Sequence, residues 1–222
     1  MASIRLCSLR QSGRAALAGS SAGLALEALE SHMSSPRLPR VPILEPAQMT
    51  PEQKRIYDVI TSGPRGQVRG PLAVWLHRPA LAEPAQALGR YCRFETSLPP
   101  RLSEWAILIL AHHWRSDFEW WAHKPPALKA GISVEMIEAL RDGQPIPYGD
   151  PDEALIHEFL NVLHAERAIP QELYDRIVHV LGEAGVIDLV GIAGYYTMIS
   201  MTLNVFDIRP PEGKPCELGA VE

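Results

Sequence analysis

Three side chains that can exchange protons, Glu104, Glu119 and His123, lie within 20 residues of an otherwise apolar and aromatic stretch. Glu119 and His123 are four residues apart, so on a helix they share one face about a turn from each other. A carboxylate beside an imidazole can fix the tautomer of the ring and raise its basicity, as general acid–base catalysis requires. The spacing predicts an acid–base site in which His123 donates and accepts the proton and Glu119 orients it. Glu104 would be a second acid–base group or a support.

Each of these residues also has an alternative role. An acid and a histidine four residues apart are common on helices without any function, and Glu104 could simply pair with Arg101. Either His112 or His113 could join the Glu119–His123 pair as a third metal ligand, but not both, because neighbouring helical residues point about 100° apart. Three such ligands would suit a catalytic zinc ion. No HExxH spacing is present, and no metal is expected.

The elements that must position these residues are helices. Thr50-Pro51-Glu52-Gln53 forms a capping box with proline at the first helical position. Apolar residues recur near the helical period through the rest of the chain, and no segment alternates with period two between hairpin turns. The pattern predicts an all-α protein, with helices over about 50–60, from 79, from 100, 116–129, 133–141, from 150, 170–181 and 186–204.

The chain divides into four parts by composition. Residues 1–32 are rich in Arg and Ser, carry no acid before Glu27, and are expected to be a leader, tag or upstream extension outside the fold. Residues 33–49 form a proline-rich arm that we expect on a surface or on a neighbouring subunit. Residues 50–208 are predicted to form the helical domain, and residues 209–222 a C-terminal tail.

Composition excludes several classes of partner. The net charge is −5, and no Lys/Arg run is interleaved with aromatic residues, so nucleic acid is not expected. The apolar stretches 106–110 and 186–203 are too short or interrupted by Asp188, which predicts core helices and no membrane span. Cys7, Cys92 and Cys216 form no CxxC pair and fit a reducing compartment. We therefore expect a cytoplasmic protein, or an organellar one if residues 1–32 are a transit peptide.

The motifs together resemble a known family. RLSEWAILILA at 101–111, FEWWAH at 118–123, ALKAGIS at 127–133, DEALIHEFL at 152–160 and a late GYY with Asn204 are similar to the carboxymuconolactone decarboxylase and alkyl hydroperoxidase D family. The resemblance covers roughly residues 50–208. It implies an all-helical fold that assembles as a homo-oligomer, a trimer or a hexamer, with the active site near a subunit interface.

The position of the family's cysteines decides which branch the chain resembles. The peroxidase branch carries a glutamate, a CxxC pair and a histidine, and the two cysteine positions correspond to Ser116 and Glu119 here. Neither residue can replace the thiols that peroxide reduction needs. The resemblance is therefore to the decarboxylase branch, which has E-x-x-x-H without cysteines. Pro125-Pro126 is a departure that predicts a kink just after His123.

The resemblance implies an enzyme, a lyase that works without a cofactor. The expected reaction is decarboxylation, or a related proton-transfer lyase or isomerase step, on a small carboxylated lactone or ring compound. Alternatives are a lactone hydrolase or metal-assisted enzyme on the same fold, or a non-catalytic helical oligomer that binds a ligand. Candidate substrate contacts are two guanidinium groups, two indoles and two phenols: Arg101, Arg115, Trp120, Trp121, Tyr195 and Tyr196. The arginines could equally be helix-end charges, and the tryptophans core residues.

Overall fold

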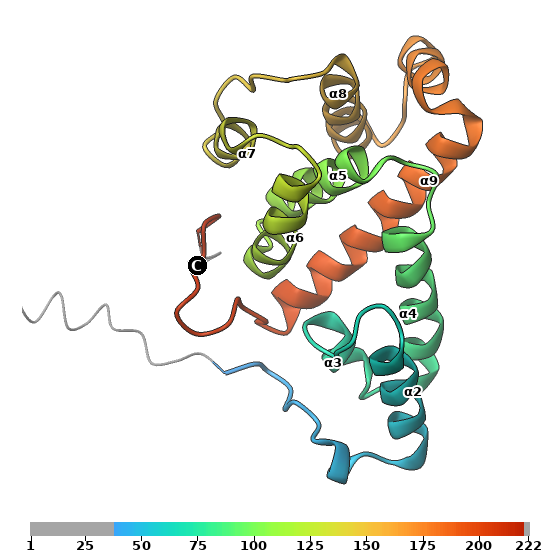
Figure 1. Ribbon diagram of the computed structural model, residues 1–222, viewed down its shortest axis with the longest axis vertical. Helices are drawn as coiled ribbons and strands as arrows, with labels where there is room; N and C mark the ends of the chain where they lie inside the picture. The colour runs from blue at the N-terminus through green and yellow to red at the C-terminus, as the bar shows by residue number, and fades with distance from the viewer. Residues whose placement is uncertain (1–37, 220–222) are drawn as a thin grey trace, which may run out of the picture. The chain divides into compact units, whose positions relative to one another are not determined.

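The computed structural model describes residues 38–219, and in this part of the chain the regular structure is entirely helical (Figure 1). The elements are a 3₁₀ turn and eight α-helices: η1 (Pro46–Gln48), α2 (Pro51–Ser62), α3 (Pro71–Trp75), α4 (Pro79–Phe94), α5 (Pro100–His113), α6 (Asp117–Lys129), α7 (Val134–Arg141), α8 (Pro151–Glu166) and α9 (Gln171–Val205). The all-α prediction is confirmed for these residues.

The helices begin where the local chemistry predicts. Thr50 accepts a hydrogen bond from the Gln53 N–H, and the Gln53 side chain accepts one from the Thr50 N–H, which completes the predicted capping box. Ser133 caps α7 through the Met136 N–H. α3 was missed, because its five residues fall at the end of a Gly/Pro stretch that reads as a loop.

α5 is the central helix of the described residues. It packs against α6, α8 and α9, and its residues from Leu102 to Ala111 are buried except Glu104 (Figure 1). A helix that is apolar on nearly every side needs neighbours on every side. The consequence for the site is that Glu104 projects as the only charged side chain between Leu102 and Ala111 of this enclosed helix.

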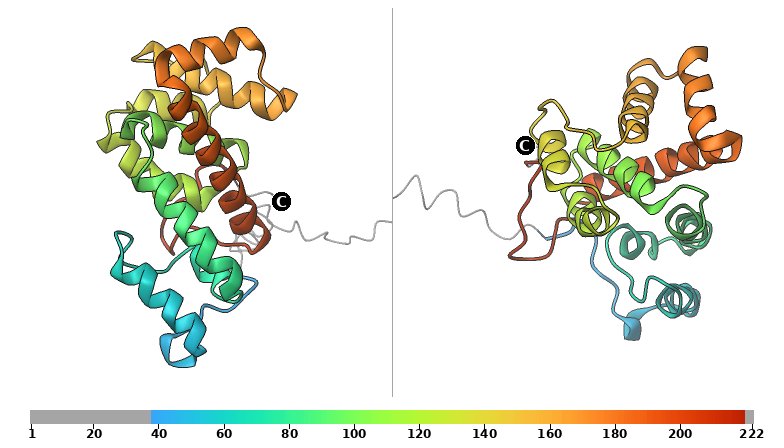
Figure 2. Two further views of the ribbon diagram at one scale, coloured as in Figure 1. Left: turned by 90° about the vertical axis from the view of Figure 1, so that its right-hand side faces the viewer. Right: turned by 45° about the horizontal axis from the view of Figure 1, so that its top comes forward.

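α9 is bent at Gly182, whose φ of 70° and ψ of 167° interrupt the helical geometry (Figures 1 and 2). α9 therefore consists of two helical stretches that meet at Gly182, in agreement with the separate helices predicted at 170–181 and 186–204, and glycine tolerates the positive φ at the junction. By length and composition α9 is the one helix of residues 38–219 that could cross a membrane. Its buried face packs on α4, α5 and α8, however, and Asp188 accepts hydrogen bonds from Tyr91 and Ser97, which is typical of a core helix.

α6 runs without interruption from Asp117 to Lys129, with Pro125 and Pro126 inside it. The two prolines therefore do not end the helix, and the kink predicted just after His123 stays a prediction. Helical backbone hydrogen bonding continues beyond the prolines, where the Ala130 N–H donates to the Pro126 carbonyl over 2.9 Å. Packing offsets the cost of the missing donors, since Ala127 is fully buried and α6 packs against α5.

The described ends of the chain are tied to the helical body. In the arm, Arg40 donates from its backbone N–H to the Phe206 carbonyl and from its guanidinium to the Val205 carbonyl. The His77 ring is hydrogen-bonded to the Pro42 carbonyl. The arm thus lies on the chain's own surface, at the C-terminal end of α9.

Candidate functional site

Packing of α6 against α5 brings the three predicted proton-transfer residues into one chain of hydrogen bonds. His123 Nδ1 lies 2.6 Å from Glu104 Oε2, and His123 Nε2 lies 2.9 Å from Glu119 Oε1. Glu119 and His123 come from adjacent turns of α6, as their spacing predicts, whereas Glu104 reaches the ring from α5. The structure therefore places a carboxylate on each nitrogen of a single imidazole.

The chain Glu104–His123–Glu119 is shielded from water. Glu119 is 4% exposed and His123 is 2% exposed. Burial by itself disfavours the imidazolium, but the charges and hydrogen bonds of Glu119 and Glu104 outweigh it, and the pKa of His123 is raised above its ordinary value. The ring can donate to both carboxylates only as the imidazolium, so the cationic form is the one that fits this geometry.

Tyr196 of α9 completes the surroundings of the imidazole. Its ring meets the His123 ring edge to face, with centroids 5.2 Å apart and planes at 85°. Burial raises the pKa of Tyr196 well above its ordinary value, so the phenol stays neutral. This edge-to-face contact helps to hold the imidazole in its orientation.

A pocket of about 170 Å³ opens onto this chain of hydrogen bonds. Glu119 and His123 line it and Glu104 does not, which places Glu104 behind the imidazole and Glu119 at the pocket surface. Cavities of roughly 150 Å³ hold one benzene-sized ring, so the pocket suits a small ring compound. Its walls come from the loop between α2 and α3 and from α3, α4, α6 and α9.

Three arginines that sequence reasoning missed, Arg65, Arg69 and Arg93, also line the pocket. Within residues 38–219 none of them forms an ion pair with a carboxylate. A signal for the first two exists in the sequence: between Asp58 and Glu83 the chain has three arginines and no acid. Excess positive charge in a Gly/Pro loop indicates an anion-binding loop, although nothing local connects that loop to His123.

The two arginines predicted to clamp a carboxylate lie elsewhere, and that prediction is corrected. Arg101 is paired with the buried carboxylate of Glu153 and with Asp150, 3.3 Å away, at the start of α8. Arg115 is exposed and donates to the Leu218 carbonyl over 3.0 Å. Neither lines the pocket. Both stand near Glu119 in sequence, but the helix geometry directs them to other partners.

The predicted aromatic contacts divide in the same way. Tyr195 and Tyr196 line the pocket. Trp120 is buried on another side of α6 and donates to Glu217, over 3.3 Å. Trp121 supports the pocket from outside its lining, with the Arg69 guanidinium 5.2 Å above its ring. Neither tryptophan therefore forms part of the pocket surface.

The remaining candidate ligands do not converge on His123. His112 and His113 line a separate cavity on the far end of α5, with Arg115, Arg141 and Asn161. Among residues 38–219 no group of three His, Cys, Asp or Glu side chains is arranged to hold a metal ion. The alternative set of one of these histidines with Glu119 and His123 is therefore not formed by the fold.

Two thiols fall within the described residues, and neither lines the pocket. Burial, reinforced by the charge of Asp188, raises the pKa of Cys92 to about 11, so its thiol stays protonated at neutral pH. Cys216 lies in the C-terminal segment, and burial also raises its pKa. Cys7 lies outside the described residues.

Comparison with solved structures identifies the class of fold. An uncharacterized peroxidase-related protein from Silicibacter sp. TM1040 superimposes with a TM-score of 0.64 at 14% identity, covering 81% of this chain and 96% of the other. The alkylhydroperoxidase AhpD core of an uncharacterized peroxidase-related protein from Ralstonia eutropha JMP134 gives a TM-score of 0.65 at 14% identity, covering 80% and 95%. The chain thus has the all-helical AhpD-like fold, which confirms that part of the family resemblance. No family model and no curated protein matches its sequence.

Proposed function

We propose that the protein is a cofactor-independent lyase or isomerase that transfers a proton to or from a small carboxylated lactone or ring compound, with decarboxylation as the leading reaction. The observation that carries the proposal is the buried chain Glu104–His123–Glu119, which faces a pocket the size of one ring. The fold alone does not imply this reaction, because one scaffold hosts many activities.

The geometry supports a revised division of roles within the chain of hydrogen bonds. His123 Nε2 is occupied by Glu119, so the group that meets the substrate is the Glu119 carboxylate. With the imidazolium present, Glu119 is a base. Movement of one proton from Nε2 to Glu119 makes Glu119 an acid and leaves a neutral ring that still donates from Nδ1 to Glu104. His123 is then the proton reservoir, and Glu104 sets its charge and orientation.

This proton chain suits decarboxylation beside a conjugated carbonyl. The bond between the ring carbon and its carboxylate breaks, carbon dioxide leaves, and the electron pair is delocalised into the carbonyl. Glu119 then delivers to the ring system the proton that it received from His123 Nε2, and a proton from solvent restores the imidazolium. The substrate's own carbonyl acts as the electron sink, so atoms and charge balance without a redox partner.

The residues of the site do not support thiol chemistry. Ser116 and Glu119 occupy the positions that correspond to the two cysteines of the peroxidase branch, and the pKa of the buried Cys92 is too high for a thiolate. The peroxidase-related descriptions belong to the two structural neighbours. A carboxylate in place of one of the two thiols is consistent with proton transfer at this site.

The test is release of carbon dioxide from a panel of carboxylated unsaturated lactones. Glu119→Gln and His123→Gln should each lower turnover by about 10²- to 10⁴-fold, because each removes a member of the proton chain. The control Glu138→Gln, at an exposed position of α7, should keep turnover within about twofold of the wild type. Lactone consumption without carbon dioxide would indicate the hydrolase alternative, and turnover that survives both site substitutions would refute acid–base catalysis here.

A further inference from the structure

Three polar atoms at one end of the pocket have no partner. Arg65 Nε, Arg65 Nη2 and Tyr195 Oη are buried, and none of them forms a hydrogen bond with residues 38–219. A buried guanidinium or phenol without a partner costs free energy, so such atoms in one place indicate a ligand that satisfies them. Both side chains line the same pocket as Glu119 and His123.

The two side chains are brought together by a glycine. A Cβ on Gly89 of α4 would lie 1.9 Å from Tyr195 Oη and 2.8 Å from Arg65 Nη2. Only the absence of a side chain at this position lets the guanidinium from the α2–α3 loop and the phenol from α9 meet above α4. Burial raises the pKa of Tyr195 to about 12, against the opposing charge of Arg65, so the phenol keeps its proton as a donor.

Aromatic rings, not carboxylates, hold the pocket arginines in place. The guanidinium groups of Arg65 and Arg93 lie 5.9 Å and 5.5 Å from the centre of the Phe94 ring. Arg69 stacks on Trp121, and the pKa of Arg69 is lowered by burial and by the nearby charge of Arg93. Cation–π contacts position a guanidinium without using its N–H donors. The donors therefore remain available to an anion.

The position of the loop is itself set by packing. Gly70 has a φ of 57°, and a Cβ there would lie 2.6 Å from Phe118 Cε1 of α6. A side chain at this position would push the loop that carries Arg65 and Arg69 away from the α6 surface. The loop is thus fitted against the helix that carries Glu119 and His123.

We infer that Arg65 and the Tyr195 hydroxyl form a subsite for an anionic oxygen group of the ligand, and that this subsite selects charged ring compounds over their neutral isosteres. This inference rests on the proposed function, which makes the pocket the substrate site. It adds which class of ligand that site prefers. A carboxylate on the ligand would accept hydrogen bonds from Arg65 Nε and Nη2 and from Tyr195 Oη, with Arg69 and Arg93 adding charge around it. That contact would hold the ring with its reacting carbon toward Glu119.

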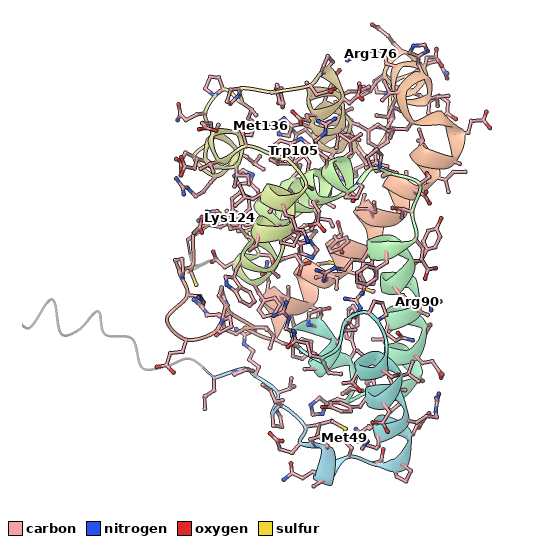
Figure 3. All side chains as sticks on the ribbon, viewed as in Figure 1. Met49, Arg90, Trp105, Lys124, Met136 and Arg176 are labelled. Carbon is pink, nitrogen blue, oxygen red and sulfur yellow. The ribbon has the colours of Figure 1, made fainter. Side chains whose placement is uncertain are left out.

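The test is isothermal titration calorimetry of the full chain at low ionic strength with two inert probes, benzoate and its uncharged isostere benzamide. Wild-type protein should bind benzoate and bind benzamide at least about tenfold more weakly. Arg65→Gln should lower the affinity for benzoate at least about tenfold, and Tyr195→Phe should lower it severalfold. Neither substitution should change the affinity for benzamide much. The control is Arg90→Gln, which removes an exposed arginine on the outer side of α4 that does not line this pocket (Figure 3).

Glu119→Gln separates this inference from the proposed reaction. It should lower turnover by about 10²- to 10⁴-fold but bind benzoate at least as tightly as wild type, because a negative charge near the subsite is removed. Circular dichroism melting of each variant establishes that it is folded before binding is compared. Equal affinity of the wild type for the two probes, no benzoate binding, or unchanged benzoate affinity in Arg65→Gln would overturn the inference. A change in molar mass in Arg65→Gln with unchanged benzoate affinity would assign the guanidinium to a subunit interface instead.

Discussion

His123 has a carboxylate on each ring nitrogen, and this arrangement links the proposed chemistry to stability. The two hydrogen bonds are both satisfied only when the ring is charged. Its neighbours raise the pKa of His123 against the effect of burial. The same interaction that stores a proton for Glu119 therefore stabilises the folded state, and it does so in a pH-dependent way.

We predict that stability linked to His123 falls as the pH rises. A histidine whose folded pKa exceeds its unfolded value contributes fully below the unfolded pKa, about 6.5, and loses that contribution as the pH passes through the raised folded pKa. Urea unfolding from pH 5.5 to 9.5 should show this loss in wild type and not in His123→Gln. An NMR titration of the ring should give a midpoint above 6.5. A midpoint below 6.5 would contradict the charged form.

At the scale of elements, the C-terminal segment stabilises α6 from the side away from the pocket. Glu217 Oε2 accepts from Lys124 Nζ over 2.6 Å and from Trp120 Nε1 over 3.3 Å, and Arg141 Nη1 lies 3.6 Å away. The Leu218 N–H donates to Asp117 over 2.8 Å at the start of the same helix. Figure 3 shows Lys124 on the side of α6 that faces this segment. α6 lacks two backbone N–H donors at its prolines, and these contacts with the C-terminal segment stabilise it.

We predict that Glu217→Gln destabilises the protein by about 1 kcal/mol, because the Lys124 and Trp120 donors lose their shared carboxylate. The melting temperature should fall by about 2–4 °C, and trypsin should cut at Lys214 faster. Glu212→Gln, an exposed carboxylate in the same segment, is the control.

The pH dependence of the Glu217 effect checks its cause. Burial by itself would raise the pKa of Glu217, but Lys124 and Trp120 lower it overall. The contribution of a carboxylate with a lowered pKa is lost as the pH falls through that value, so the difference between wild type and Glu217→Gln should shrink at acid pH. A difference that is constant down to pH 3 would indicate lost packing instead.

At the scale of the whole molecule, α9 carries an apolar stripe with no cover among the described residues. Ile187 is 72% exposed, Val190 50%, Met201 41% and Val205 56%. These positions recur at helical spacing along one face, and Gly194 between them leaves that face flat. Exposed apolar stripes of this kind mark interaction sites. We propose that the chain self-associates through this face of α9, as the family resemblance implies for a trimer or hexamer.

We predict that Ile187→Glu combined with Val190→Glu lowers the molar mass measured by light scattering to that of one chain. Two carboxylates cannot be buried unpaired in an apolar interface, whereas on an exposed face they are solvated. Val134→Glu, at an exposed valine of α7, is the matched control and should keep the oligomer. An unchanged mass in the double variant would place the interface elsewhere, and a monomeric wild type would refute self-association.

Local chemistry determined the helices and half of the site. The caps at Thr50 and Ser133 and the shared face of Glu119 and His123 follow from contacts between residues three or four apart. These interactions form within a single helix, so the sequence pattern alone predicts them. Proximity in sequence predicts Glu104 only as a second acid–base group or a support, and its contact with His123 Nδ1 depends on how α5 packs on α6.

Only the tertiary structure decided which cations face His123. Arg101 and Arg115 are the arginines nearest to Glu119 in sequence, yet they pair with Glu153 and the Leu218 carbonyl, while Arg65 and Arg93 come from a loop and a helix that precede α5. A long side chain can turn to several partners, and its choice depends on packing between segments tens of residues apart. The sequence by itself therefore determined the all-helical scaffold and the acid–histidine pair, and the three-dimensional packing determined the pocket, its arginines and the order Glu104–His123–Glu119.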